Sequence, residues 1–192
     1  MRKLLPALVI LLLAVVLRTH QIATLPPGPH YDEAANLLIT RSIAFGGAQL
    51  FPIANSYQGR ETLYHYLGAA GFHLFGDRAF TLQIISLYSG VLTVALTIAL
   101  GAAMFRGRRG LLVGIGAGAL LAISLHHIAL SRQGYRAITL PLMQAAALWT
   151  LWRGLNARRD WPWLLAGGVL AGATLYTYMA ARLFPVWLAL AG

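Results

Sequence analysis

Cysteine is absent from this chain and acidic side chains are scarce, with five Asp and Glu among 192 residues. The lack of cysteine excludes disulfide bonds and thiolate metal sites. Only 10% of the residues are charged and 58% are hydrophobic, whereas soluble domains carry about 25% charged residues. The composition therefore indicates a protein with several membrane spans rather than a water-soluble domain.

An excess of basic residues gives the chain a formal net charge of +10. Nucleic-acid binding is one explanation for such an excess. The 15 Lys and Arg residues, however, fall in short clusters between apolar runs. That distribution is typical of charges that set membrane topology, and we expect no nucleic-acid partner.

Long apolar runs predict the membrane spans, because about 20 apolar residues cross the hydrocarbon core of a bilayer. Arg18 lies in the first run and is expected to snorkel toward the interface. A basic leader also fits a signal peptide, but no small-x-small cleavage site follows it, which favours an uncleaved anchor. The predicted spans cover residues 4–24, 79–105, 110–131, 137–152 and 161–181, with a sixth, incomplete one at 183–192.

Two basic clusters, at residues 106–109 and 153–159, alternate with the basic N-terminus along the predicted spans. The positive-inside rule places all three in the cytoplasm. We therefore predict a multi-pass protein of the cell membrane with a cytoplasmic N-terminus, and with Pro29 and Asn55 outside. The fold class is all-α and polytopic, and residues 1–192 resemble the N-terminal part of a longer membrane domain.

The predicted outer loop, residues 25–78, contains four of the five acids and has structure of its own. Residues 31–45 and 61–75 are typical of amphipathic helices, and each run is followed by glycine. Aromatic residues in the second run suit a position at the membrane interface. We expect this loop to form a cap of interfacial helices.

Two of the scarce acids, Asp32 and Glu33, are adjacent behind a proline-rich turn and open the first of these helices. One interpretation is a helix N-cap with a carboxylate at the positive helix end. The other is a functional site. Adjacent helical residues point about 100° apart, so one carboxylate would face a cleft while the other supports it.

The remaining acids have simple explanations. Asp77 and Asp160 precede predicted spans and are expected to be N-caps. Glu61 is expected in the first turn of the second outer helix, beside a solvated Arg60.

His126 and His127 are adjacent, which is poor spacing for two ligands on one helical face, so a structural role is favoured over a metal site.

Three arginines fall at the predicted outer ends of spans: Arg132, Arg136 and Arg182. The first two would share a helical face at i and i+4. Snorkelling at the interface explains them without a site. Alternatively, the three converge on the face that carries the acids and hold an anionic head group, because guanidinium groups match phosphate.

The order of these motifs resembles the GT-C membrane glycosyltransferases, in particular the bacterial dolichyl-phosphate-mannose protein mannosyltransferase and aminoarabinose transferase group. The resemblance rests on the early acidic pair, on the helix beginning at residues 59–67 and ending at 74–76, and on residues 131–136 after the third span. Many relatives have Lys-Pro-Pro where this chain has Arg60-Glu61-Thr62. Some carry a further acid where it has Tyr135-Arg136.

This resemblance implies transfer of a hexosyl or pentosyl group from a polyprenyl-phosphate donor to a lipid, glycan or protein acceptor on the outer face. It assigns Asp32 as the catalytic base with Glu33 as its neighbour. The candidate substrate-binding residues are Arg60, Glu61, Tyr64, Arg132, Arg136 and Arg182. No cofactor is expected, and although a divalent metal ion is compatible with this chemistry, nothing in the sequence supports one. The alternatives are a polytopic transporter and a non-catalytic membrane assembly subunit.

Overall fold

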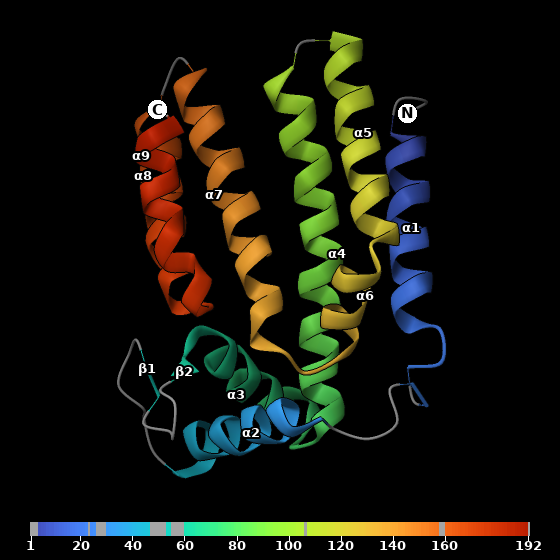
Figure 1. Cartoon of the computed structure of the whole chain (residues 1–192), viewed down its shortest axis with the longest axis vertical. Helices are drawn as coiled ribbons and strands as arrows, with labels where there is room; N and C mark the ends of the chain where they lie inside the picture. The colour runs from blue at the N-terminus through green and yellow to red at the C-terminus, as the bar shows by residue number, and fades with distance from the viewer. Residues whose placement is uncertain are drawn as a thin grey trace.

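Upright helices form a bundle, and two shorter helices lie across one end of it (Figure 1). The computed structural model describes residues 4–22, 24–25, 30–46, 53–54, 60–105, 107–157 and 160–191. The upright helices are α1 (Leu5–Thr19), α4 (Ala79–Met104), α5 (Gly107–Ile123), α7 (Thr139–Leu155), α8 (Trp161–Ala173) and α9 (Phe184–Ala191). The fold is therefore all-α, as predicted, apart from one short pair of strands.

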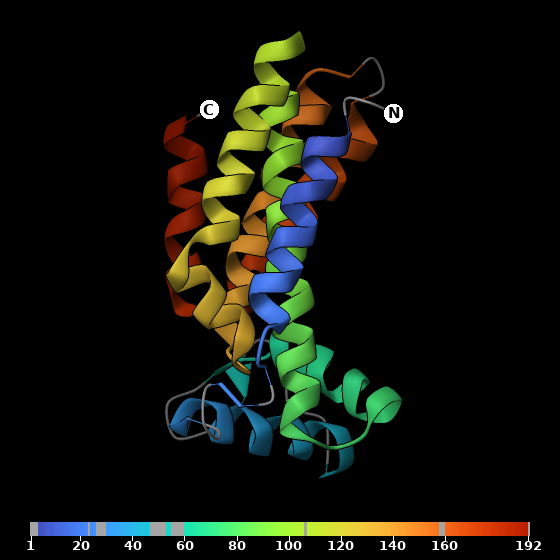
Figure 2. The same cartoon turned by 90° about the vertical axis from the view of Figure 1, so that its right-hand side faces the viewer.

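The crossing helices are α2 (Tyr31–Arg41), followed by a π-helical turn (Ser42–Gly46), and α3 (Leu63–Phe75). The antiparallel strands β1 (Ile53–Ala54) and β2 (Arg60–Glu61) precede α3. Figure 2 shows the same crossing arrangement after a 90° turn. We call this end of the bundle the site end. The opposite end, where α4 leads into α5 and α7 into α8, is the remote end.

Helix α2 has an inverted amphipathic pattern. Its buried positions are the polar residues Glu33, Asn36 and Thr40, spaced at i, i+3 and i+7 on one helical face. Apolar side chains such as Leu38 are exposed. The helix therefore turns polar groups toward the bundle and apolar groups outward, which suits a helix lying on a membrane interface.

Small residues bring α4 and α5 into close contact. The buried positions of α5 are Gly110, Gly114, Gly118 and Ala122, four residues apart. A Cβ added at Gly114 would lie 2.3 Å from the carbonyl oxygen of Ile98, so only glycine fits there. This stripe is the small-residue packing that membrane helices use when backbones approach closely.

The segment expected as one span at residues 110–131 is broken. Helix α5 ends at Ile123, and α6 (Leu125–Arg132) starts after Ser124 at an angle of 62°. Arg18 lies at this break and is fully buried, so the expectation that it snorkels outward is wrong. The guanidinium donates to the carbonyl oxygens of Ala14 (3.0 Å) and Ala122 (3.1 Å), and its Nη2 lies 2.8 Å from Nδ1 of His127.

The predicted spans are reproduced unevenly. Among the described residues, α4 alone is long and apolar enough to cross a bilayer, and α5 with α6 passes the same test as a bent pair. Helix α1 and the segment Met179–Leu190 are shorter apolar helices. The segment 161–181 is helical only to Ala173, and 3₁₀ turns at Thr174–Tyr176 and Met179–Leu183 follow before α9.

Two predicted N-caps differ from the structure. Arg78, not Asp77, occupies the cap position of α4. Asp77 instead forms an ion pair with Arg41, because α2 and α3 bring their ends together. The single Nε–H of Arg41 is shared between the two carboxylate oxygens, at 2.7 and 2.8 Å. Asp160 does occupy the cap position of α8, but its side chain makes no capping hydrogen bond.

Candidate active site

His30, not Asp32, is the N-cap of α2. Its Nδ1 accepts from the backbone N–H of Asp32 at 3.5 Å, and its own backbone N–H donates to Oε2 of Glu33 at 3.3 Å. This reciprocal arrangement is a capping box. The cap therefore occupies Glu33 and leaves the carboxylate of Asp32 for another role.

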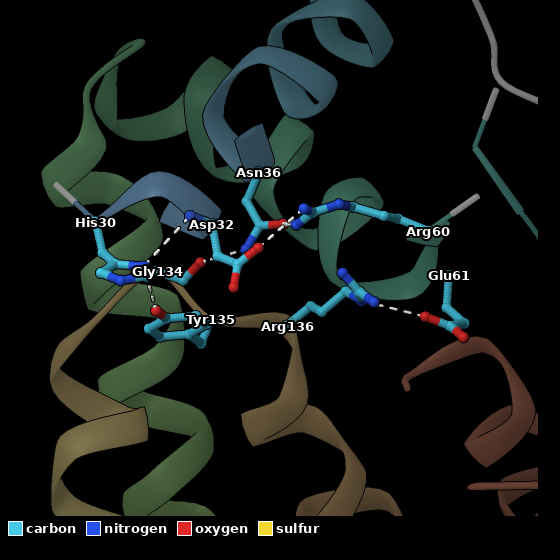
Figure 3. Close-up of polar contacts among 8 residues, drawn as sticks. All are labelled: His30, Asp32, Asn36, Arg60, Glu61, Gly134, Tyr135 and Arg136. Carbon is cyan, nitrogen blue, oxygen red and sulfur yellow. Dashed lines mark hydrogen bonds and ion pairs between the residues drawn. The ribbon is translucent and has the colours of Figure 1, made fainter. Parts of the chain in front are cut away.

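Asp32 is held by a buried arginine. Nη2 of Arg60 donates to Oδ1 of Asp32 at 2.9 Å, and Nη1 donates to Oδ1 of Asn36 at 3.0 Å (Figure 3). The Arg60 side chain is 8% exposed, whereas that of Asp32 is 44% exposed. The expected solvated Arg60 is thus incorrect, because β2 places it beneath α2. A fixed guanidinium orients a carboxylate that stays accessible.

Glu33 is buried and connects α2 to the turn before α7. Its Oε1 accepts from the backbone N–H of Gly134 at 2.6 Å and from Nε2 of Gln83 at 3.4 Å. Asn36 completes the link by donating to the carbonyl of Gly134 at 2.7 Å. A Cβ at position 134 would lie 3.1 Å from both Glu33 and Leu82, so glycine permits this approach.

A second ion pair lies next to the first along the chain. Nε of Arg136 donates to Oε2 of Glu61 at 3.1 Å, with side-chain exposures of 16% and 6%. The same guanidinium lies 5.2 Å from the ring centroid of Tyr178. Because Arg60 and Glu61 are consecutive residues of β2, this strand joins the two ion pairs.

Beneath these pairs, α3 contributes Tyr64 and His65, both fully buried. The Tyr64 hydroxyl lies 2.9 Å from both the Leu82 carbonyl and the Ser86 hydroxyl, so this candidate substrate-binding residue is in the core. Nδ1 of His65 lies 3.1 Å from the Thr40 hydroxyl. Burial, reinforced by the charges of Arg136 and Arg60, lowers the pKa of His65 to about 3, and the ring is neutral.

Tyr135 closes the site on the side of the N-cap. Its hydroxyl lies 2.8 Å from Nδ1 of His30, and the two rings are 6.1 Å apart. Partial burial, together with the charges of Asp32 and Glu33, raises the pKa of Tyr135. The hydroxyl therefore stays protonated and can donate a hydrogen bond.

The three arginines at the predicted span ends separate in the structure. Helix α6 ends at Arg132, and the chain turns before Arg136, so the expected shared helical face is absent. Arg132 donates to the carbonyl oxygens of Leu17 (3.1 Å) and Leu25 (2.9 Å). Arg182 is exposed in a 3₁₀ turn. Only Arg136 of the three contacts an acid of the candidate site in the described part of the chain.

Several site residues were missed from the sequence. Asn36, Gly134, His30 and Tyr135 link the acids. None of them was assigned a role in the site from the sequence, although Gly134 and Tyr135 lie in the motif at residues 131–136. The buried polar stripe of α2 was a usable signal, because a helix on a soluble core has apolar residues at that spacing. Within the described ranges, no three His, Asp or Glu side chains gather in a way that would hold a metal ion.

Comparison with known families identifies the class of protein. A family model described as dolichyl-phosphate-mannose-protein mannosyltransferase matches residues 62–191, which is more than half of the chain. The chain therefore belongs to this family, and it is a membrane glycosyltransferase of the GT-C, mannosyltransferase type. The match begins after Asp32, Glu33 and Arg60. No curated protein and no solved structure matches the chain significantly.

Proposed function

We propose that this protein transfers a sugar from a polyprenyl-phosphate donor to an acceptor hydroxyl at the outer face of the membrane. The observation that carries the proposal is Asp32, a half-exposed carboxylate oriented by the buried guanidinium of Arg60. A carboxylate held at a fixed position and open to solvent suits a general base. The family supports sugar transfer as the reaction.

The proposed reaction uses both members of this ion pair. Asp32 takes the proton of the acceptor hydroxyl while the acceptor oxygen forms a bond to the anomeric carbon of the sugar. The bond from that carbon to the phosphate oxygen breaks, and its electron pair leaves with the lipid phosphate. Protonation of Asp32 removes the negative charge facing Arg60. The guanidinium is then free to stabilise the leaving phosphate.

Arg136 is the second cation that we assign to the donor phosphate. Its planar guanidinium is positioned by Glu61 and Tyr178 and remains partly exposed. Arg132 is a weaker candidate, because its terminal nitrogens donate to two backbone carbonyls. Arg182 and Glu61 stay in the proposed set, as an exposed cation and as the residue that orients Arg136.

An apolar cavity of about 390 Å³ lies between α1 and the first half of α4. We assign it to the isoprenoid tail of the donor, because apolar walls suit a hydrocarbon chain. The residues that line it include Thr19, Ile22, Phe80, Ile84 and Tyr88. Thr19 and Phe80 belong to the ends of α1 and α4 that lie at the site end.

Sugar transfer is tested directly with the full-length protein in proteoliposomes that contain radiolabelled polyprenyl-phosphate sugars. We expect label to move to the acceptor in a time-dependent manner. Counterflow of a free solute without transfer would instead indicate a transporter. Absence of both activities across mannose, glucose and aminoarabinose donors would support a non-catalytic subunit.

Joint substitution of Arg136 and Glu61 by Gln is expected to weaken donor binding by about 1.5–3 kcal/mol, the contribution of a hydrogen bond to a charged group. Changing both residues avoids leaving Glu61 as a lone buried charge. Binding is measured by titration of the donor lipid. The control removes the exposed pair Arg41 and Asp77 as Gln and Asn, and it should not alter affinity. Unchanged affinity in the first double variant would contradict the phosphate role of Arg136.

The topology is tested by single cysteines, which the cysteine-free chain allows without background. Tyr31 and Leu155 are 77% and 73% exposed and lie at the site end and the remote end. The basic clusters at residues 106–109 and 153–159 support a cytoplasmic remote end. We expect an impermeant maleimide to label Tyr31→Cys in intact cells and Leu155→Cys only after permeabilisation. The reverse pattern would place the site inside.

A further inference from the structure

The remote end of the bundle contains a cavity of about 430 Å³, which is within the range of small-molecule sites. It lies between the C-terminal ends of α4 and α7 and the start of α8. These helix ends are at the opposite end of the bundle from α2 (Figure 1). The lining residues are Ala103, Trp152, Arg153, Asn156, Ala157 and Trp163. The cavity is therefore distinct from the candidate active site.

Arg153 is held in this cavity by aromatic rings. Its guanidinium lies 5.1 Å from the ring centroid of Trp149 and 5.2 Å from that of Trp163. The two indoles are themselves 5.8 Å apart in an edge-to-face arrangement. Cation–π contact with the two rings holds the guanidinium at this wall of the cavity. Its N–H groups lie in the plane of the group, where a phosphate can accept from them.

Arg153 has no carboxylate partner in the described part of the chain. The ion pairs found there involve other arginines: Arg41 with Asp77, Arg60 with Asp32, and Arg136 with Glu61. The nearest acid in the sequence, Asp160, is exposed at the start of α8 and belongs to none of these pairs. The edge of the Arg153 guanidinium is thus open to an external anion.

The other walls of the cavity are fixed by hydrogen bonds. Nε1 of Trp152 donates to the carbonyl of Ala103 at 2.9 Å, which ties α7 to α4. Nδ2 of Asn156 donates to the carbonyl of Trp152 at 2.8 Å, and the same amide nitrogen keeps a second N–H group. The cavity therefore combines a preformed wall with two kinds of hydrogen-bond donor.

The surroundings of the cavity are basic. Arg108 and Arg109 are exposed in the first turn of α5 at the same end. Tryptophan is enriched at the membrane interface. Basic pockets between membrane helices bind anionic lipid head groups.

We propose that this cavity binds the phosphodiester head group of an anionic phospholipid from the leaflet at the remote end. Arg153 donates from its open edge to the phosphate oxygens, and Asn156 donates its remaining N–H. The indole rings of Trp152 and Trp163 contact the glycerol region. The site concerns the membrane around the enzyme and does not depend on the sugar-transfer chemistry proposed above.

The proposal is tested by native mass spectrometry of the full-length protein titrated with phosphatidylglycerol or phosphatidylcholine. We expect preferential retention of phosphatidylglycerol, and Arg153→Gln to weaken it about tenfold, as loss of a charge-assisted hydrogen bond does. Arg153→Lys keeps the charge but lacks the planar fork, and it should lose most of the preference. Arg78→Gln, an equal loss of exposed charge at the opposite end of α4, should leave retention unchanged.

Asn156→Ala is a second variant, and it leaves the Arg153 guanidinium and its contacts with the two indole rings in place. It is expected to weaken phosphatidylglycerol about 2- to 10-fold, the effect of one neutral hydrogen bond. Equal weakening by Arg153→Gln and Arg78→Gln would reduce the effect to general surface charge and overturn the site. Wild-type retention in Arg153→Lys and Asn156→Ala together would also overturn it.

Discussion

Asp32→Asn is expected to lower the rate of sugar transfer by about 10²- to 10⁴-fold, the usual contribution of a positioned general base. An amide has the size of the carboxylate and can still accept the hydrogen bond from Arg60, but it cannot take a proton. Because the Asp32 side chain is 44% exposed and does not cap α2, the variant should still fold. Some stability is lost, because the buried Arg60 no longer faces a negative charge. The expected result is therefore a folded protein without activity.

Glu33→Gln is the matched control, since it is the same chemical change one residue away. Glu33 is 3% exposed and accepts from the backbone of His30 and Gly134 and from Gln83. The NH₂ group of a glutamine would face N–H donors there instead of accepting from them, so this variant should lose about 1–3 kcal/mol of stability. Its rate, measured at a temperature where it is folded, should stay much closer to wild type.

Transfer rate and thermal unfolding are measured together for both variants in the full-length protein. Near-wild-type transfer by Asp32→Asn would eliminate Asp32 as the base. A folded Glu33→Gln variant without turnover, beside an active Asp32→Asn variant, would reverse the roles of the pair. The two measurements separate loss of catalysis from loss of stability, because Asp32 is half-exposed and Glu33 is buried.

The helical architecture was predictable because apolar runs of the right length dominate the sequence. Helix α4 spans Ala79–Met104, and the prediction was 79–105. Both outer helices, predicted at residues 31–45 and 61–75, form at Tyr31–Arg41 and Leu63–Phe75. Local patterns suffice for such elements, since each depends on neighbouring residues only. The expected place of Glu61 in a first helical turn is wrong, because it lies in β2.

The break at Ser124 and the burial of Arg18 were not predictable from local patterns. Helices α5 and α6 taken together are apolar enough for one continuous span, and no proline marks the bend. The acceptors of Arg18 on α5 and α6, Ala122 and His127, lie 104 and 109 residues away in the sequence. From hydropathy alone, an arginine at the end of a span is expected to snorkel to the interface. The burial of Arg18 is visible only from its tertiary contacts.

The different roles of Asp32 and Glu33 also depend on tertiary contacts between residues far apart in the sequence. The sequence indicated that the two carboxylates point in different directions, but it left open which one faces the cleft. Which carboxylate turns inward is set by Gly134, whose backbone N–H donates to Glu33 although the two residues are 101 positions apart in the sequence. Arg60 likewise became a site residue because β2, rather than a helical turn, positions it.

Arg18→Met is expected to destabilise the protein by about 1–3 kcal/mol, the cost of leaving a buried polar group without its hydrogen-bond partner. Arg18 is 0% exposed and joins α1 to the break between α5 and α6. Its removal leaves the Ala122 carbonyl and Nδ1 of His127 without their donor in a region of apolar packing. The Gly134 turn follows α6, so the damage should extend to the site.

The measurement is unfolding of the purified protein in lipid nanodiscs, followed by circular dichroism with increasing denaturant. Arg182→Met is the control, because it removes an exposed arginine and should shift stability by no more than about 0.5 kcal/mol. The double variant Arg18→Met with His127→Leu removes the cation together with its neutral acceptor and should recover part of the loss, since apolar replacements of buried polar pairs are tolerated. If Arg18→Met matches Arg182→Met in stability, the buried arginine does not hold the broken span in place.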